Sequence, residues 1–288
     1  MSVLITNAMV NQYKANVIQL SQQKGSRLEG KVRVERDING FQYFFERLNK
    51  TAAVPKLNRH GDTPQVDSQH DRRMVTLIDY EWADLIDKED KVRVLINPES
   101  EYAIAAAWAL GRAKDDVILS AANGNAFVGQ TGSTLSALPA TQKIANASAG
   151  LTLAKLLQAK YILDFNDVDP DIERHILVGA QHIQDMLNTT EVKNYDYNTV
   201  KALVNGQINT FVGFDFTMIN RLIGATDGGK SAVIAYAQTG LALAIGLDIK
   251  TRITERADKS YSVQVYVSET LGATRVEDEK VVEVSCND

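Results

Sequence analysis

The chain has 288 residues, of which 44% are apolar and 23% are charged, and its formal net charge at pH 7 is -5. This composition is typical of a globular protein with one large domain or two packed ones, and it excludes a disordered or fibrous chain. The acidic balance and the lack of any Lys/Arg block also exclude tight or sequence-specific nucleic-acid binding, which requires a basic face.

The cysteine and histidine residues indicate neither a disulfide framework nor a metal site. Cys286 is the single cysteine, so no intrachain disulfide can form. The four histidines are scattered: His60, His70, His175 and His182. We expect them to be surface or half-buried polar residues. No secretory signal is visible and apolar runs such as 103–110 are too short to cross a membrane, so we expect synthesis in the cytoplasm.

The first 86 residues predict an arm followed by strands. Apolar residues recur at helical spacing over 7–21, which predicts a short amphipathic helix. Residues 31–48 and 73–86 are alternating, β-branched or aromatic-rich and are predicted strands. The connection over 50–72 is long, carries both charge signs and lacks an apolar pattern. It is either a mobile surface loop or, as we favour, part of a projecting hairpin that contacts another chain.

Residues 98–121 are the clearest predicted helix. Asn97 suits the cap and Pro98 the first helical position, while Gly124 ends the helix. Trp108 lies among alanines in its middle. We expect its ring to fill the gap between the helix and an apolar stripe on the last long strand. That stripe is formed by Tyr261, Val263, Val265 and Val267.

The remaining elements alternate helices and strands. Residues 125–150 are small and polar and predict a loop. A helix over 151–163 is expected to bury Leu151, Ala154, Leu157 and Tyr161 on one face. Further predicted elements are a buried strand at 175–180, helices at 181–187 and 198–208, and strands at 210–219, 233–237, 242–246 and 259–270. A final strand at 280–285 is expected to pair back onto the strand before it. Strands before and after a central α/β region predict an α+β fold.

Residues 224–231 read GATDGGKS and match the phosphate-binding loop pattern. The motif residues are Gly224, Gly229, Lys230 and Ser231. Such a loop works only between a buried strand and a helix. Asn220 and Arg221 stand where that strand should be apolar, and the following residues are β-branched. A flexible turn explains the pattern just as well, and we predict that the segment binds no nucleotide.

Acidic pairs could indicate acid/base catalysis or a cation site. They are Glu89 with Asp90, Asp115 with Asp116, and Asp167 with Asp169. Their turn-like or helix-surface contexts favour solvated side chains. No nucleophile–base pattern or metalloprotease motif is present. We therefore predict no catalytic, cofactor-binding or metal-binding residues, and a protein that is not an enzyme.

Three segments carry a resemblance to a known family: 71–90, 96–124 and 239–284. Together they resemble the major capsid proteins of tailed bacteriophages with the Hong Kong 97-like fold, in a short form without a fused scaffolding segment.

The resemblance covers essentially the whole chain and implies a set of domains. These are an N-terminal arm (1–35), an extended loop (36–80), a peripheral domain with a long spine helix (81–124 and 250–288) and an axial domain (125–249).

The resemblance implies self-assembly into hexamers and pentamers of an icosahedral shell around viral double-stranded DNA. The implied partners are other copies of the chain, a separate scaffolding protein, a portal and a decoration or cement protein, with non-specific DNA contact and no membrane. The implied location is the virion, after synthesis in the host cytoplasm. Two alternatives remain open: an encapsulin-like nanocompartment shell and a P-loop nucleotide-binding protein.

Overall fold

The computed structural model describes residues 22–56, 58, 59, 63, 65–87, 98–188, 210–228 and 230–287. The chain forms two compact units. The first comprises Met1–Phe41, Leu77–Leu119 and Leu243–Gly272, and the second comprises Gln42–Thr76, Ser120–Ala242 and Ala273–Asp288. The helices expected at 7–21 and 198–208 lie outside the described residues. No helix in the described part of the chain has the length and apolar character that crossing a membrane requires.

The first unit is built on a four-stranded sheet with strand order β1-β12-β13-β4. The strands are β1 (Arg33–Glu35), β12 (Leu241–Arg256), β13 (Ser262–Arg275) and β4 (Ile78–Ile86). β12 continues ten residues beyond the strand expected at 242–246. The expected strand at 73–86 divides at Leu77, because its first half pairs in another sheet.

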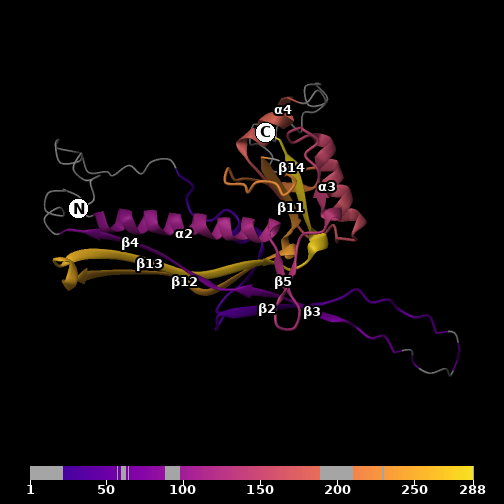
Figure 1. Ribbon diagram of the computed structural model, residues 1–288, viewed down its shortest axis with the longest axis horizontal. Helices are drawn as coiled ribbons and strands as arrows, with labels where there is room; N and C mark the ends of the chain where they lie inside the picture. The colour runs from indigo at the N-terminus through magenta and orange to yellow at the C-terminus, as the bar shows by residue number, and fades with distance from the viewer. Residues whose placement is uncertain are drawn as a thin grey trace. The chain divides into compact units, whose positions relative to one another are not determined.

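Helix α2 (Pro98–Asn123) covers one face of this sheet and confirms the predicted long helix. β13 and β4 pair antiparallel in a register that sets Val267 opposite Trp82. Val267 is fully buried with Ala106 and Leu110 of α2, and Trp82 packs against the same cluster. Figure 1 shows α2 running along these strands. Because side chains alternate along a strand, α2 covers odd-numbered β13 residues and even-numbered β4 residues.

The predicted role of Trp108 is wrong. The aromatic ring that packs between helix and sheet is that of Trp82, which comes from the sheet. Trp108 is half-buried on α2, and the ammonium of Lys24 lies 5.5 Å from the centre of its ring. Tyr261 is 58% exposed in the turn before β13 and does not belong to the buried stripe.

The second unit contains a six-stranded sheet with strand order β7-β14-β11-β8-β10-β9. Its strands are β7 (Lys143–Ile144), β14 (Val281–Cys286), β11 (Ser231–Ala237), β8 (Arg174–Val178), β10 (Phe214–Met218) and β9 (Thr210–Phe211). Every residue of β8 and β14 is buried. The strand expected at 210–219 is broken by a turn in which Val212 and Gly213 have positive φ.

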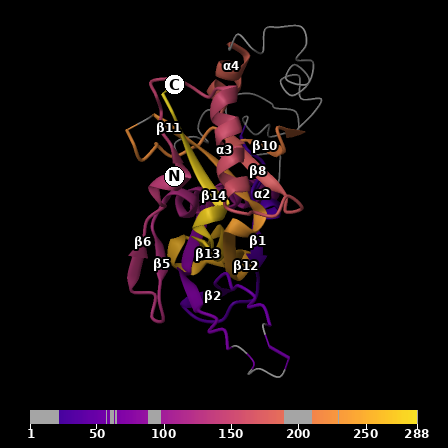
Figure 2. The same ribbon diagram turned by 90° about the vertical axis from the view of Figure 1, so that its right-hand side faces the viewer.

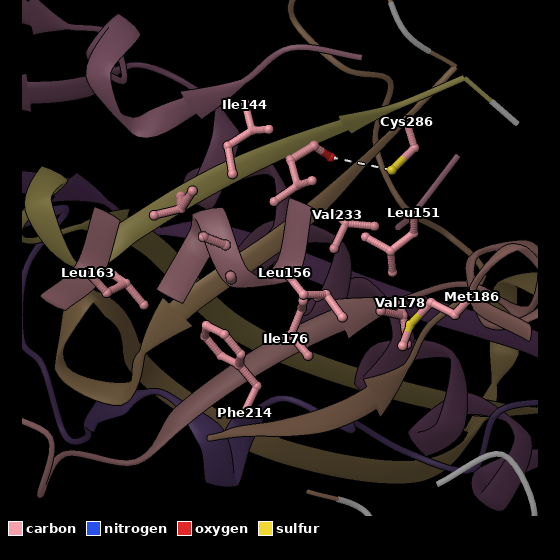
Figure 3. Packing of buried hydrophobic residues seen from close by; sticks show 14 of the residues in the cluster. Ile144, Leu151, Leu156, Leu163, Ile176, Val178, Met186, Phe214, Val233 and Cys286 are labelled. Carbon is pink, nitrogen blue, oxygen red and sulfur yellow. Dashed lines mark hydrogen bonds between the residues drawn. The ribbon is translucent and has the colours of Figure 1, made fainter. Parts of the chain in front are cut away.

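Helix α3 (Leu153–Phe165) packs on this sheet, and α4 (Ala180–Asn188) follows β8 directly. Thr152 caps α3 by accepting a hydrogen bond from the backbone N–H of Lys155. Figure 3 shows Leu156 and Leu163 of α3 among the buried residues Ile176, Val233 and Phe214. Burial of one such side chain contributes about 1.5–3 kcal/mol.

The apolar face predicted for α3 is wrong. Leu157 and Tyr161 are 50% and 64% exposed, whereas Leu156 and Leu163 are fully buried. The helix carries apolar residues around most of its circumference, so the spacing alone could not tell which stripe faces the core.

The last strand does not pair back onto β13 as expected. β14 pairs antiparallel with β11, from Ser231 opposite Cys286 to Tyr236 opposite Val281, and parallel with β7. Figure 2 shows β14 beside α3. Its full burial on both faces fits a central strand of a sheet better than a hairpin edge.

A third sheet, also in the second unit, has strand order β2-β3-β5-β6. Its strands are β2 (Gln42–Leu48), β3 (His70–Thr76), β5 (Ala126–Val128) and β6 (Thr134–Ser136). β2 and β3 pair antiparallel, with Leu48 opposite His70. A further backbone hydrogen bond of 2.9 Å joins the N–H of Asn49 to the carbonyl of Gln69. The predicted hairpin is therefore confirmed, and 49–69 form its connection (Figure 1).

Candidate functional site

The GATDGGKS segment is a turn between two strands. It follows β10 and leads directly into β11, which pairs antiparallel with β8 and β14. A phosphate-binding loop needs a helix after the lysine, because the helix N-terminus presents the backbone N–H groups that bind phosphate. Here Ser231 begins a strand. Gly229 lies outside the described residues, and Lys230 is exposed.

The polar groups of this turn bind other parts of the same unit. The backbone N–H and the hydroxyl of Thr226 both donate to the Glu283 carboxylate, at 2.7 and 2.9 Å. The Asp227 carboxylate accepts from the N–H of Asn146 and from the Ser285 hydroxyl. The backbone N–H of Lys230 donates to the carbonyl of Cys286. These hydrogen bonds attach the segment to β14, so its polar groups have a structural role.

Ser231 lies beside a histidine in a geometry unsuited to nucleophilic catalysis. The His182 ring contacts the Ser231 hydroxyl through Nε2 at 2.7 Å, while Nδ1 accepts the backbone N–H of Gly179 at 3.0 Å. A neutral imidazole that accepts at Nδ1 carries its proton on Nε2. Nε2 therefore donates to the hydroxyl, whereas a general base would accept a proton from it.

One of the predicted solvated acids is buried. Asp115 of α2 is 0% exposed and accepts hydrogen bonds from the 22–31 segment. The donors are the Ser26 hydroxyl at 2.6 Å and the backbone N–H groups of Arg27 and Leu28 at 3.1 and 3.2 Å. The solvated interpretation is wrong for Asp115, because its position in sequence gave no sign of the segment that covers it.

The other described acidic residues of those pairs lie at the surface or in a local turn. Asp116 and Asp167 are exposed, and Asp169 accepts from the N–H of Asp171 in a local turn. Glu89 and Asp90 lie outside the described residues. Within the residues that the structure describes, no three acidic, histidine or cysteine side chains gather in a metal-binding group.

Gly111 explains why the 22–31 segment can lie so close to α2. A Cβ atom on Gly111 would stand 2.6 Å from the backbone of Gly25 and Ser26. Glycine normally weakens a helix interior. At this position it allows the backbone of the segment to cross the helix. Arg112, next to it, donates to the side chain of Gln22 and to the carbonyl of Gln23.

A buried ion cluster also joins this segment to the rest of the first unit. The Lys114 ammonium lies 2.9 Å from a carboxylate oxygen of Glu29 and 2.7 Å from one of Glu269. Burial raises the pKa of Glu269, and Lys114 opposes that rise. Burial would lower the pKa of Lys114, but the two carboxylates outweigh it and raise that pKa. One ammonium shared by two carboxylates accounts for the rise in the pKa of both Lys114 and Glu269.

Replacing Gly111 by alanine should release the 22–31 segment while leaving α2 intact. The new methyl group collides with the backbone of Gly25, although alanine favours the helix by about 1 kcal/mol. We expect faster amide hydrogen exchange at Arg27 and Leu28, whose N–H groups bind Asp115. Gly30→Ala is the matched control, because nothing lies within 4 Å of its added Cβ. Equal exchange in both variants would contradict the role of Gly111.

The base of the β2–β3 hairpin is held by ion pairs in the second unit. The Arg47 guanidinium lies 2.6 Å from the Asp71 carboxylate on the facing strand. Burial would raise the pKa of Asp71, but the hydrogen bond and charge of Arg47 lower it below its ordinary value. Arg73, which is 2% exposed, lies 2.7 Å from Asp278. The connection therefore begins and ends on a fixed base.

A family model described as "Phage capsid protein" matches residues 5–288. The chain belongs to the phage capsid protein family. A search of curated proteins finds no match to the sequence.

Solved capsid structures share the fold of this capsid protein. The capsid of Ralstonia phage GP4 has a TM-score of 0.74 at 10% identity, covering 97% of this chain and 96% of the other. The capsid of cyanophage P-SCSP1u has a TM-score of 0.71 at 13% identity, covering 97% of this chain and 94% of the other. The capsid of cyanophage Pam1 has a TM-score of 0.69 at 12% identity, covering 97% of each chain. The expected α+β, Hong Kong 97-like fold is confirmed.

The capsid protein is a major capsid subunit that forms the icosahedral shell of a virion. Nothing in the comparisons favours the nanocompartment shell or the nucleotide-binding protein. For the latter, the strand that begins at Ser231 stands where the motif requires a helix.

Proposed function

We propose that the capsid protein assembles into hexamers and pentamers that close a shell around double-stranded DNA, and that its β2–β3 hairpin contacts a neighbouring subunit. The hairpin carries this proposal. Its base is fixed by Arg47 and Asp71, yet apolar side chains in and next to the connection remain exposed. Leu48 is 58% exposed, Val54 54% and Val66 45%. Several exposed apolar side chains along one element are typical of an interaction surface.

Deleting 55–68 tests the proposal. The shortened connection still joins Leu48 to His70, and the ion pairs at the base remain, so the variant should fold and stay soluble. We expect no closed particles in electron micrographs or in sedimentation. A matched control replaces the same residues with a glycine/serine stretch of equal length, which restores chain length but not the side chains. Normal particles from either variant would contradict a contact made by these side chains.

The proposal extends to partners and chemistry. We infer that a separate scaffolding protein, a portal and a decoration or cement protein act with the shell. We also infer synthesis in the host cytoplasm, and contact with packaged DNA that is weak and non-specific. The net charge of -5 supports weak contact, because proteins that bind DNA tightly neutralise its phosphates with lysine and arginine side chains. Nε2 of His182 donates to the Ser231 hydroxyl instead of accepting its proton, which supports a subunit without catalytic activity.

For roles within the shell, we propose an N-terminal arm (1–35), an extended loop (36–80), a peripheral domain (81–124 with 250–288) and an axial domain (125–249). Strand β14 lies within 250–288, which we assign to the peripheral domain. It nevertheless pairs in the six-stranded sheet, whose other strands come from 143–237.

A further inference from the structure

Asparagine followed by glycine is the pair of residues most prone to lose the asparagine side-chain amide. Glycine has no side chain to hinder attack by its backbone nitrogen on the neighbouring carboxamide. The chain contains this pair at Asn39–Gly40, Asn123–Gly124 and Asn205–Gly206. The third pair lies outside the described residues. The other two differ in what the fold does with the glycine nitrogen.

The Asn39–Gly40 pair lies in a segment of the first unit that is neither helix nor strand, and both residues are exposed. Gly40 has a φ of 117°, which glycine adopts far more readily than other residues, so the backbone itself favours glycine after Asn39. Among the residues that the structure describes, none forms a hydrogen bond with the Asn39 side chain or with the Gly40 N–H. No described hydrogen bond therefore holds the two reacting groups apart.

The Asn123–Gly124 pair is held by its surroundings in the second unit. Asn123 is the last residue of α2, and the Gly124 N–H donates to the carbonyl of Ser120 at 2.8 Å. The side-chain amide of Asn123 donates to the carbonyl of Gly224 at 3.4 Å. A nitrogen held in a hydrogen bond at the end of a helix cannot turn toward the neighbouring side chain. The fold therefore protects this pair.

We propose that Asn39 is a site of spontaneous deamidation in this capsid protein. The Gly40 backbone nitrogen attacks the side-chain carbonyl carbon of Asn39 and closes a five-membered succinimide ring. The bond from that carbon to Nδ2 breaks, and ammonia leaves with the proton of the Gly40 N–H. One water molecule then opens the ring at either carbonyl, which gives an aspartyl or an isoaspartyl linkage. Water is the only co-reactant, and no group is oxidised or reduced.

The modification changes the segment that leads into the β2–β3 hairpin. The Ile38 N–H donates to the carbonyl of Ile245 at 3.3 Å, and the Leu77 N–H donates to the carbonyl of Phe41 at 3.0 Å. These hydrogen bonds flank the reacting pair. An isoaspartyl linkage adds a methylene to the backbone between them, and either product adds a negative charge close to the exposed Asp37. Both N–H groups should therefore exchange faster with solvent in the modified chain.

The two pairs can be compared within one chain. The unassembled full-length protein is incubated at mildly alkaline pH, and a parallel sample is kept in urea. Trypsin then releases 37–47, in which Asn39 is the sole asparagine, and 115–143, which contains Asn123. Mass spectrometry measures the fraction of each asparagine that has become an acid. In the native protein Asn39 should convert at least about tenfold faster than Asn123, because only the latter needs local opening of the fold. In urea the two rates should converge.

Asn39→Gln is the matched control. Its side chain is one methylene longer and would have to close a less favourable six-membered ring, so 37–47 should stay unmodified over the same period. Equal rates at Asn39 and Asn123 in the native protein would show that the fold does not select the site. Conversion of Asn39 in urea but not in the native protein would overturn the proposal. These measurements need no shell, so their outcome is independent of the proposed assembly.

Discussion

Replacing Arg275 by methionine should lower the free energy of unfolding of the second unit by about 3–5 kcal/mol, the range for breaking a buried ion pair. Arg275 is 0% exposed. Its guanidinium lies 2.5 Å from the Asp278 carboxylate. It also donates to the carbonyls of Ala122, Gly124 and Ser136 at 3.2, 2.7 and 3.0 Å. Methionine fills similar space but removes a donor from three carbonyls and from the partly buried carboxylate of Asp278.

Urea denaturation followed by circular dichroism measures this loss. Arg275→Lys keeps the charge but not the planar fork, so it should recover only part of the stability. Arg256→Met is the matched control: Arg256 pairs with Asp258 at 2.5 Å, but on the surface. Exposed pairs contribute little. Similar denaturation midpoints for Arg275→Met and Arg256→Met would show that Arg275 does not stabilise the unit.

Local patterns predicted most elements but not their partners. The cap and stop signals placed α2 within two residues, and alternation identified β13. The error at β14 is of another kind. Val281, Val282 and Val284 are as suitable for pairing with β13 as with β11, and only tertiary packing selects β11. Likewise, the spacing around Trp108 showed that a large ring lay on α2 but not which side of the helix faced the sheet.

The buried cations escaped prediction altogether. Lys155 stands in LTLAKLL, where a lysine normally marks the solvent side of an amphipathic helix. It is instead 7% exposed, and its ammonium donates to the carbonyls of Asn146, Ala149, Gly150 and Ser285. The only available signal was a lone charge between apolar residues. The segments that supply the carbonyls are as many as 130 residues away in sequence.

The same limit explains the phosphate-loop motif. The letters of GATDGGKS describe a turn rich in glycine, and the chemistry of the turn depends on whether a helix or a strand comes after it. The β-branched residues after Ser231 already favoured a strand. In the structure, the Glu283 carboxylate accepts from the backbone N–H of Thr226, and the Asp227 carboxylate accepts from the Ser285 hydroxyl. These hydrogen bonds hold the turn in place.

Replacing Lys114 by methionine should destabilise the first unit by about 3–5 kcal/mol at neutral pH, and by less in acid. The change leaves the Glu269 carboxylate, 0% exposed, without its cation. Burial already raises the pKa of Glu269 above its ordinary value of 4.5, and loss of Lys114 removes the influence that opposes the rise. The folded variant therefore keeps a proton that the unfolded chain releases.

A raised carboxyl pKa makes the free energy of unfolding fall as pH rises from 4.5 through the folded-state pKa. Acidification thus returns stability to Lys114→Met, and its difference from wild type should shrink between pH 7.5 and pH 5. Lys114→Met with Glu269→Gln should lose less at pH 7.5 than the single variant, because no unpaired carboxylate stays buried. The remaining carboxylate, Glu29, still has the guanidinium of Arg36. A loss independent of pH, unrelieved by Glu269→Gln, would mean that packing of the lysine stem stabilises the unit and its charge does not.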